Sequence, residues 1–257
     1  CHGIHDVVSP KKANSKWNSK NLIVTCGKCH QDASDHYLTS NHAEAFKNGD
    51  KGAPNCISCH KSSITKSAFK DNKVEMKKAQ ERLCLSCHLD NDDVRQRTAP
   101  SAGFIHAYDN SVHGFALHKK NNGDAASCTD CHSSHQIIKG IDSRSSVFKL
   151  NIPNTCGKCH SNVQKEFTES IHGQLVAKGN GDAPSCTNCH GEHNILKTDD
   201  PNSPVAFQNV SREICSPCHE SMKLSEKYGI SANRYKTFSQ SYHGLALSGG
   251  SASVANC

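Results

Sequence analysis

The chain has 257 residues, of which 35% are hydrophobic and only 5% aromatic, and its mean hydropathy is −0.65. This composition gives little material for an ordinary apolar core, and no run approaches the roughly 18 apolar residues of a membrane span. The formal net charge is +6, and the chain holds 16 cysteines and 18 histidines. Cysteine and histidine are therefore the features that need explaining.

Short helices separated by long irregular connections are predicted. Helical periodicity or composition marks four segments, and Gly49, Gly179 and Gly249 are placed to end three of them. Strand-like alternation is nearly absent, although Leu22–Thr25 and Ile137–Ile138 could form small pairings. The expected fold class is mainly α plus irregular coil. The four predicted helical segments are Asp32–Lys47, Asn72–Leu83, Val163–Lys178 and Arg234–Leu247.

Seven pentapeptides of the form Cys-x-x-Cys-His recur along the chain. In the attachment site of c-type haem, the two thiols form thioethers with the haem vinyl groups and the histidine becomes an axial iron ligand. Zinc ribbons and disulfide frameworks do not need a histidine directly after the second cysteine. The sequence therefore favours haem over zinc or disulfides. The seven motifs are Cys26–His30, Cys56–His60, Cys84–His88, Cys128–His132, Cys156–His160, Cys186–His190 and Cys215–His219.

The two terminal cysteines fit the spacing of these motifs. Cys1 and His2 stand where the tail of an eighth motif would fall, and Cys257 follows His243 as Cys56 follows His42. We therefore expect a longer chain, eight haem c groups with a proximal histidine, and a ninth that begins at Cys257. A lipid-modified N-terminal cysteine is the alternative for Cys1.

The predicted haem residues follow from these motifs. The thioether cysteines are Cys1, Cys26, Cys29, Cys56, Cys59, Cys84, Cys87, Cys128, Cys131, Cys156, Cys159, Cys186, Cys189, Cys215, Cys218 and Cys257. The proximal iron ligands are His2, His30, His60, His88, His132, His160, His190 and His219.

The motifs recur with a period of about 130 residues, so that Thr25–His30 returns as Thr155–His160. Each period holds four motifs, which predicts two tandem four-haem modules, residues 1–127 and 128–257. Such self-similarity is typical of units that stack on their neighbours. Haem faces would supply the apolar surface that the composition lacks, so we expect folding to depend on haem.

Seven of the ten histidines outside the motifs occupy recurring places in the repeat, which predicts that they are distal iron ligands. They end a CHxxH extension or stand in a Ser-x-His segment. The first kind comprises His5, His135 and His193, and the second comprises His42, His113, His172 and His243.

One place in the repeat holds no histidine. Ser63 stands where the next period has His193, so the unit Cys56–His88 lacks one repeat-consistent distal ligand. His36, His106 and His118 are the candidates to replace it, with His106 and His118 favoured because they lie just downstream. Met76 and Met222 are thioether alternatives, although methionine in or near a helix is more often packing.

The motifs, the Ser-x-His-Gly segments and the CHxxH extensions resemble those of multihaem cytochromes c with doubled-CxxCH domains. The resemblance covers the whole chain, and His42 departs from it because Ala43 follows in place of glycine. This family comprises tetrahaem to many-haem electron carriers. The resemblance implies electron relay among mostly bis-His haems in anaerobic or extracellular respiration, between a donor and an acceptor that are redox partner proteins.

Two other functions stay open. A multihaem reductase or oxidase of nitrogen or sulfur compounds needs one open haem, often with lysine as the proximal ligand, and no CxxCK occurs here. We therefore predict an electron carrier with no catalytic residues. A subunit of an extracellular cytochrome filament would also show open-ended periodicity. Lys28, Lys158 and Asp130 beside the motifs are interpreted as solvated charges, with tuning of haem potentials as the alternative.

Haem changes the charge and implies a location. A bis-His haem with ionised propionates carries about −1 when ferric and about −2 when ferrous, so eight bring the total to roughly −2 or −10. Nucleic-acid binding is therefore not expected. Covalent haem attachment takes place outside the cytoplasmic membrane, which predicts a periplasmic, cell-surface or extracellular location in a prokaryote. Membrane association would come only through segments outside these 257 residues.

Overall fold

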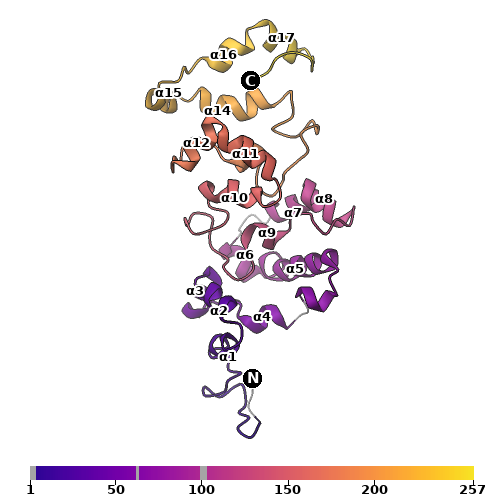
Figure 1. Cartoon of the computed structure of the whole chain (residues 1–257), viewed down its shortest axis with the longest axis vertical. Coiled ribbons are helices and arrows are strands. Elements are labelled where there is room, and N and C mark those ends of the chain that lie inside the picture. The colour runs from indigo at the N-terminus through magenta and orange to yellow at the C-terminus, as the bar shows by residue number, and fades with distance from the viewer. Residues whose placement is uncertain (1–3, 62–63, 99–102) are drawn as a thin grey trace. The chain divides into compact units, whose positions relative to one another are not determined.

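The computed structural model describes residues 4–61, 64–98 and 103–257, which form helices joined by irregular segments (Figure 1). No β-strand occurs among these residues, so the predicted class of mainly α plus irregular coil is confirmed. Cys1, His2 and Ser63 lie outside the described residues. The chain divides into two compact units, residues 1–109 with 113–166, and residues 110–112 with 167–257. The two four-haem modules stay a prediction.

Half of the described helices lie wholly in the first unit. They are α1 (Leu22–Gly27), α2 (Gln31–Leu38), α3 (Asn41–Asn48), α4 (Cys56–His60), α5 (Lys73–His88), α6 (Asp92–Thr98), α9 (Cys128–His132) and α10 (Ile152–Gly157), with the 3-10 helices η1 (Lys66–Phe69) and η2 (Lys149–Asn151). Three helices contribute residues to both units, namely α7 (Gly103–Asn110), α8 (Val112–His118) and α11 (Ser161–Glu169).

The second unit continues with short helices. They are α12 (Ile171–Ala177), α13 (Cys186–His190), the π-helix η3 (Val210–Cys215), α14 (Ser216–His219), α15 (Met222–Tyr228), α16 (Arg234–Ser239) and α17 (Tyr242–Ser248).

Three of the four predicted helical segments are each two helices. Ser40, Ser170 and Ser241 interrupt them with an extended backbone, and each serine side chain caps the helix that follows. A capping serine satisfies a backbone N–H that has no partner within its helix, so it favours a new helix start. The fourth segment is a single helix, α5, which extends beyond Leu83 to His88. The predicted helix ends at the three glycines are confirmed, since α3, α12 and α17 stop at Asn48, Ala177 and Ser248.

The two short pairings predicted from sequence were wrong. Leu22–Thr25 belongs to α1, where the Thr25 amide donates to the Asn21 carbonyl at 2.9 Å and closes a helical turn. Ile137–Ile138 is irregular, and the Ile137 carbonyl accepts one hydrogen bond from the Asn41 amide at 2.9 Å. A single bond of this kind fastens the segment to the start of α3 without forming a ladder.

A repeated polar loop follows each CHxxH. In each copy, one asparagine side chain donates to the carbonyls eight and six residues earlier, at 2.7 to 2.9 Å. The three asparagines are Asn21, Asn151 and Asn209. The segment that begins at Ile64 contains η1 and α5 instead, so the departure marked by Ser63 extends over the whole connection. The loops make the irregular connections specific structures held by side-chain hydrogen bonds.

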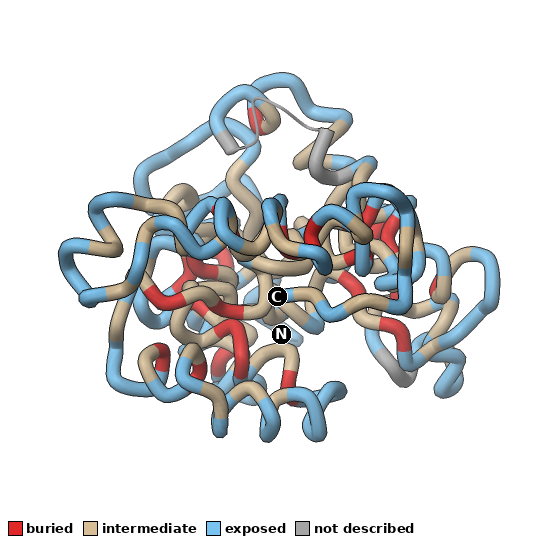
Figure 2. The backbone as a smooth tube through the Cα atoms, turned by 90° about the horizontal axis from the view of Figure 1, so that it is seen from above, coloured by how far each residue is buried: buried red, intermediate tan, exposed pale blue. Residues whose placement is uncertain are grey.

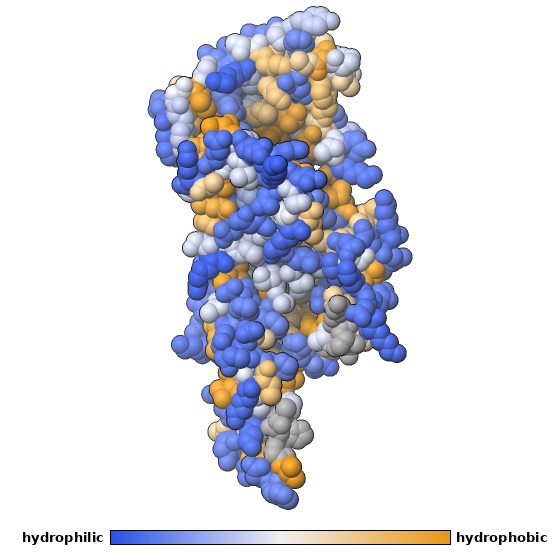
Figure 3. All heavy atoms as spheres, in the orientation of Figure 1, coloured by the Kyte–Doolittle hydropathy of each residue, from blue (hydrophilic) through white to orange (hydrophobic). Residues whose placement is uncertain are grey.

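Little apolar surface is buried in either unit. Buried residues occur as short isolated stretches along the tube in Figure 2. Most of the buried hydrophobic residues are alanine or valine, with alanine at 43, 125, 183 and 206, while serine dominates the buried polar positions. Large apolar side chains are instead exposed, and orange surface lies between the blue charged regions in Figure 3. This pattern agrees with the expected need for cofactor surface in the core.

Candidate haem sites

The Ser-x-His segments are helix N-termini that place a histidine in the first turn. In α3, α12 and α17 the serine caps the helix and the histidine is its second residue, at His42, His172 and His243. His113 takes the same place in α8, two residues after buried Ser111. The cap fixes the first turn of the helix, so it also fixes the direction of the histidine.

An aromatic residue six positions before the Gly of each Ser-x-His-Gly segment is a signal that the sequence analysis missed. A Cβ on Gly114, Gly173 or Gly244 would lie only 1.9 to 2.1 Å from the carbonyl oxygen of that aromatic residue. Glycine is therefore required by the close approach of the preceding helix. The aromatic residues are Tyr108, Phe167 and Phe238, and Tyr37 precedes Ala43 by the same interval.

Four pairs of imidazole rings lie with centroids 6.1 or 6.2 Å apart. Each pair joins one motif histidine with one histidine that the sequence analysis predicts as a distal ligand. Each pair also lies within a single compact unit. The pairs are His88 with His42, His60 with His135, His160 with His113, and His219 with His172.

This spacing is the one that an iron atom between two imidazoles would require. A ring nitrogen binds a metal at about 2.0–2.1 Å and lies about 1.1 Å from its ring centroid, so two axial imidazoles have centroids roughly 6.3 Å apart. The residues present therefore fit a bis-His haem at each pair.

Burial keeps the distal members of these pairs in the neutral form. It lowers the pKa of His42 to about 4, with a further effect from His88. Burial likewise lowers the pKa of His113, His135 and His172, each with a smaller effect from its paired motif histidine. Metal binding requires an unprotonated ring nitrogen, so this environment favours iron binding.

The motif cysteines form a succession of neighbouring attachment sites. Within each unit, a thiol of one motif raises the pKa of a thiol in a neighbouring motif. Cys26 acts in this way on Cys56, Cys84 on Cys128, and Cys218 on Cys189. Burial raises the pKa of Cys56, Cys59, Cys131, Cys189 and Cys215, as expected of thiols in apolar surroundings.

Disulfides, and zinc bound by the motif cysteines, find no support in the described part of the chain. Its 15 cysteines are free thiols, and no group of three metal-binding side chains there includes a cysteine. Structural zinc sites bring four such ligands together in a tetrahedron.

The remaining predicted ligands have separate surroundings. His118 contacts Glu81, with Nε2 2.9 Å from Oε2, while His106 and His36 are exposed. Met222 is 64% exposed, and Met76 is a half-buried residue of α5. Both motif histidines of the unit Cys56–His88 have a paired imidazole, so the vacancy expected in this unit is not seen at either of them. The roles of the remaining motif and distal histidines as iron ligands stay predictions.

The charges beside the motifs divide into two kinds. Lys28 and Lys158 are exposed, as the interpretation as solvated charges predicts. Asp130 instead accepts hydrogen bonds from the Ser127 amide and hydroxyl and lies 3.0 Å from Lys77. It completes a capping box at the start of α9, so it holds the motif helix in place.

Comparison with known proteins agrees with this geometry. A family model described as cytochrome c3 matches residues 50–161. The high-molecular-weight cytochrome c of Nitratidesulfovibrio vulgaris strain Hildenborough is 26% identical over 170 residues, which cover 64% of this chain and 28% of that protein. Both matches support a multihaem c-type cytochrome. No solved structure matches it.

Haem c is the cofactor that this family implies, and the cytochrome has the thiols and imidazoles to hold it. The matched part spans little more than a quarter of the high-molecular-weight relative. None of the described helices of the cytochrome is long and apolar enough to cross a membrane.

Proposed function

We propose that this cytochrome relays electrons along a series of mostly bis-His haems in anaerobic or extracellular respiration. The four imidazole pairs at 6.1 to 6.2 Å carry the proposal. The two histidines of each pair would both bind the iron of one haem, which would leave that iron no position for a substrate. Haem, when bound, supplies a one-electron redox change. The chain contributes the ligands, the surroundings that keep them neutral, and the spacing of the attachment sites.

Two rules describe the proposed pairing of ligands. A Ser-x-His histidine would bind the same iron as the motif histidine 46 or 47 positions later. His42 pairs with His88 in this way, and His172 pairs with His219. The CHxxH histidine His135 serves a motif 75 positions earlier, at His60. Each ligand therefore comes from a different segment than the cysteines of its site. Binding of each haem would fasten two distant segments together, which couples haem loading to folding.

The order of the attachment sites supports a relay. Motifs that follow one another in sequence have thiols close enough for one to raise the pKa of the other. In the first unit, Cys26 raises the pKa of Cys56, and Cys84 raises the pKa of Cys128. In the second unit, Cys189 and Cys257 both raise the pKa of Cys215. Cofactors tethered to neighbouring thiols are held close, so electrons would pass between successive sites within each unit.

The partners and the location are part of the same proposal. We place the cytochrome in the periplasm or on the cell surface of a prokaryote, where it exchanges electrons with redox partner proteins. The family supports this placement because c-type haem is attached outside the cytoplasmic membrane. Eight proximal histidines imply eight haems, with a ninth that begins at Cys257.

Removal of one distal histidine tests the function. In the haem-loaded protein, His172→Ala should convert one haem from low-spin to high-spin and allow it to bind cyanide, because the His219 site loses its second imidazole. Gln174→Ala, an exposed change in the same helix, is the matched control and should leave the visible spectrum unchanged. A high-spin haem that binds cyanide in the unaltered protein would favour a reductase or oxidase instead.

A further inference from the structure

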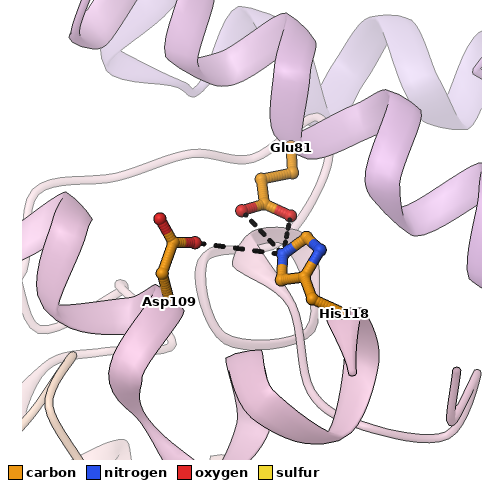
Figure 4. A group of neighbouring side chains, drawn as sticks. All are labelled: Glu81, Asp109 and His118. Carbon is orange, nitrogen blue, oxygen red and sulfur yellow. Dashed lines mark hydrogen bonds and ion pairs between the residues drawn. The ribbon is translucent and has the colours of Figure 1, made fainter. Parts of the chain in front are cut away.

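Three side chains outside the haem sites converge between α5, α7 and α8 of the first unit (Figure 4). Glu81 comes from α5, Asp109 from α7 and His118 from α8, and one potential ligand atom of each lies within 4.8 Å of the others. His118 Nε2 is 2.9 Å from Glu81 Oε2, 3.2 Å from Glu81 Oε1 and 3.9 Å from Asp109 Oδ1. We call these three residues the Glu81 cluster.

The buried carboxylate is the unusual member of this cluster. The side chain of Glu81 is only 7% exposed, and its Oε2 has no hydrogen bond of good geometry. One ring N–H of His118 can be directed at only one of the two oxygens, and the geometry is met at Oε1. A buried carboxylate oxygen without a donor costs free energy. Glu81 Oε2 therefore has no hydrogen-bond donor, although His118 Nε2 lies 2.9 Å away.

Among the residues that the structure describes, no other cation is positioned to supply that charge. Lys77 lies one helical turn before Glu81 in α5, but its ammonium donates to the Ala125 carbonyl at 2.7 Å and lies 3.0 Å from Asp130. Burial raises the pKa of Glu81, His118 acts against this shift, and the negative charge of Asp109 adds to it. The cluster thus holds two carboxyl groups against one imidazole, and each added proton would neutralise only one of them.

The donor set matches that of a divalent metal ion. One imidazole nitrogen and two carboxylate oxygens form a three-residue set of the kind used by zinc, which binds N and O ligands at about 2.0–2.2 Å. In a tetrahedral site such ligand atoms lie about 3.3 Å apart. The observed separations from His118 Nε2 bracket this value, so small side-chain movements would complete the site.

We propose that Glu81, Asp109 and His118 bind one divalent metal ion of the zinc class, separate from the haem irons. Two carboxylates and a neutral imidazole give the site a charge that the ion cancels. Asp109 is half exposed, which gives the ion a path from solvent.

Zinc binding to the haem-loaded protein tests the proposal. Protein incubated with Zn²⁺ and passed over a desalting column is analysed for zinc and iron by mass spectrometry, and affinity is measured by competition with a chelator. We expect one zinc per chain that depends on the cluster, with affinity weakened about tenfold or more in Glu81→Gln. Glu75→Gln, the same change at an exposed position of the same helix, is the matched control and should bind zinc as the unaltered protein does.

Two results would overturn the proposal. One is equal zinc content and affinity in the unaltered protein, Glu81→Gln and Glu75→Gln, which would place the zinc at other histidines. The other is no retained zinc in any of them, which would leave protons as the occupants of the cluster. Where Glu81→Gln loads less haem, Asp109→Asn is used instead, because its half-exposed side chain makes it the milder change.

Discussion

At the scale of single residues, each distal histidine in the four pairs is buried enough to favour its neutral form. The pKa of His42 is about 4 because burial, and to a smaller extent His88, penalise the charged ring. A histidine whose pKa is lowered in the folded state stays neutral well below the ordinary value near 6.5. The protein thus presents ligands that do not need to lose a proton when iron binds.

Acid titration tests this property. Because burial lowers the pKa of His42 and iron binding would lower it further, the haem of the His42 and His88 pair should stay low-spin as the pH falls from 7 to 5. The visible spectrum of the ferric protein follows the change. A contradicting result would be a high-spin band that rises between pH 7 and 6 in the unaltered protein and is missing from the titration of the His42→Ala variant.

At the scale of helices, the Ser-x-His-Gly segments combine a capping serine with a glycine that permits close approach. Sequence reasoning found the histidines of these segments from their recurrence, but it joined α2 with α3, α11 with α12 and α16 with α17. The composition on both sides of Ser40 and Ser170 is helical, so periodicity alone could not show the break. Serine three residues after an aromatic residue was the available signal, since the serine amide donates to the aromatic carbonyl at 2.9 to 3.0 Å.

Substitution of Gly173 tests the role of this close approach. A Cβ there would lie 1.9 Å from the Phe167 carbonyl oxygen, so Gly173→Ala should displace the start of α12. We expect a loss of about 1–3 kcal/mol in the free energy of unfolding, measured with denaturant, together with a weakened His172 ligand. Gly181→Ala is the control, because nothing lies within 4 Å of its added Cβ. Equal stability of the two variants would contradict the steric explanation.

At the scale of the whole molecule, we expect cofactor surface to take the place of an ordinary core. Composition indicated this from the start, and the described residues agree, since few hydrophobic residues are buried and many large apolar side chains are exposed. The motifs likewise predicted the family from sequence alone. The pairing of ligands could not be predicted, because His60 and His135 are brought together by tertiary structure and no local pattern links them. Sequence also could not show which iron is affected by Ser63, since a gap in the repeat does not reveal which iron the missing histidine would have bound.

Removal of haem tests the dependence of the fold on it. Chain produced without haem attachment should lose most of its helical circular dichroism signal and its cooperative thermal transition, because short helices are marginal without packing partners. Haem-loaded protein at the same concentration is the control. A haem-free chain that retained both signals would show that the polypeptide alone supplies a sufficient core.

Location of the irons by anomalous X-ray scattering at the iron absorption edge tests the central claim most directly. The account predicts an iron between the rings of each of the four pairs, His42 and His88 among them, with both iron-to-nitrogen distances about 2.0 Å. An iron bound to His88 with a second ligand other than His42, or an absence of iron between the paired rings, would contradict it.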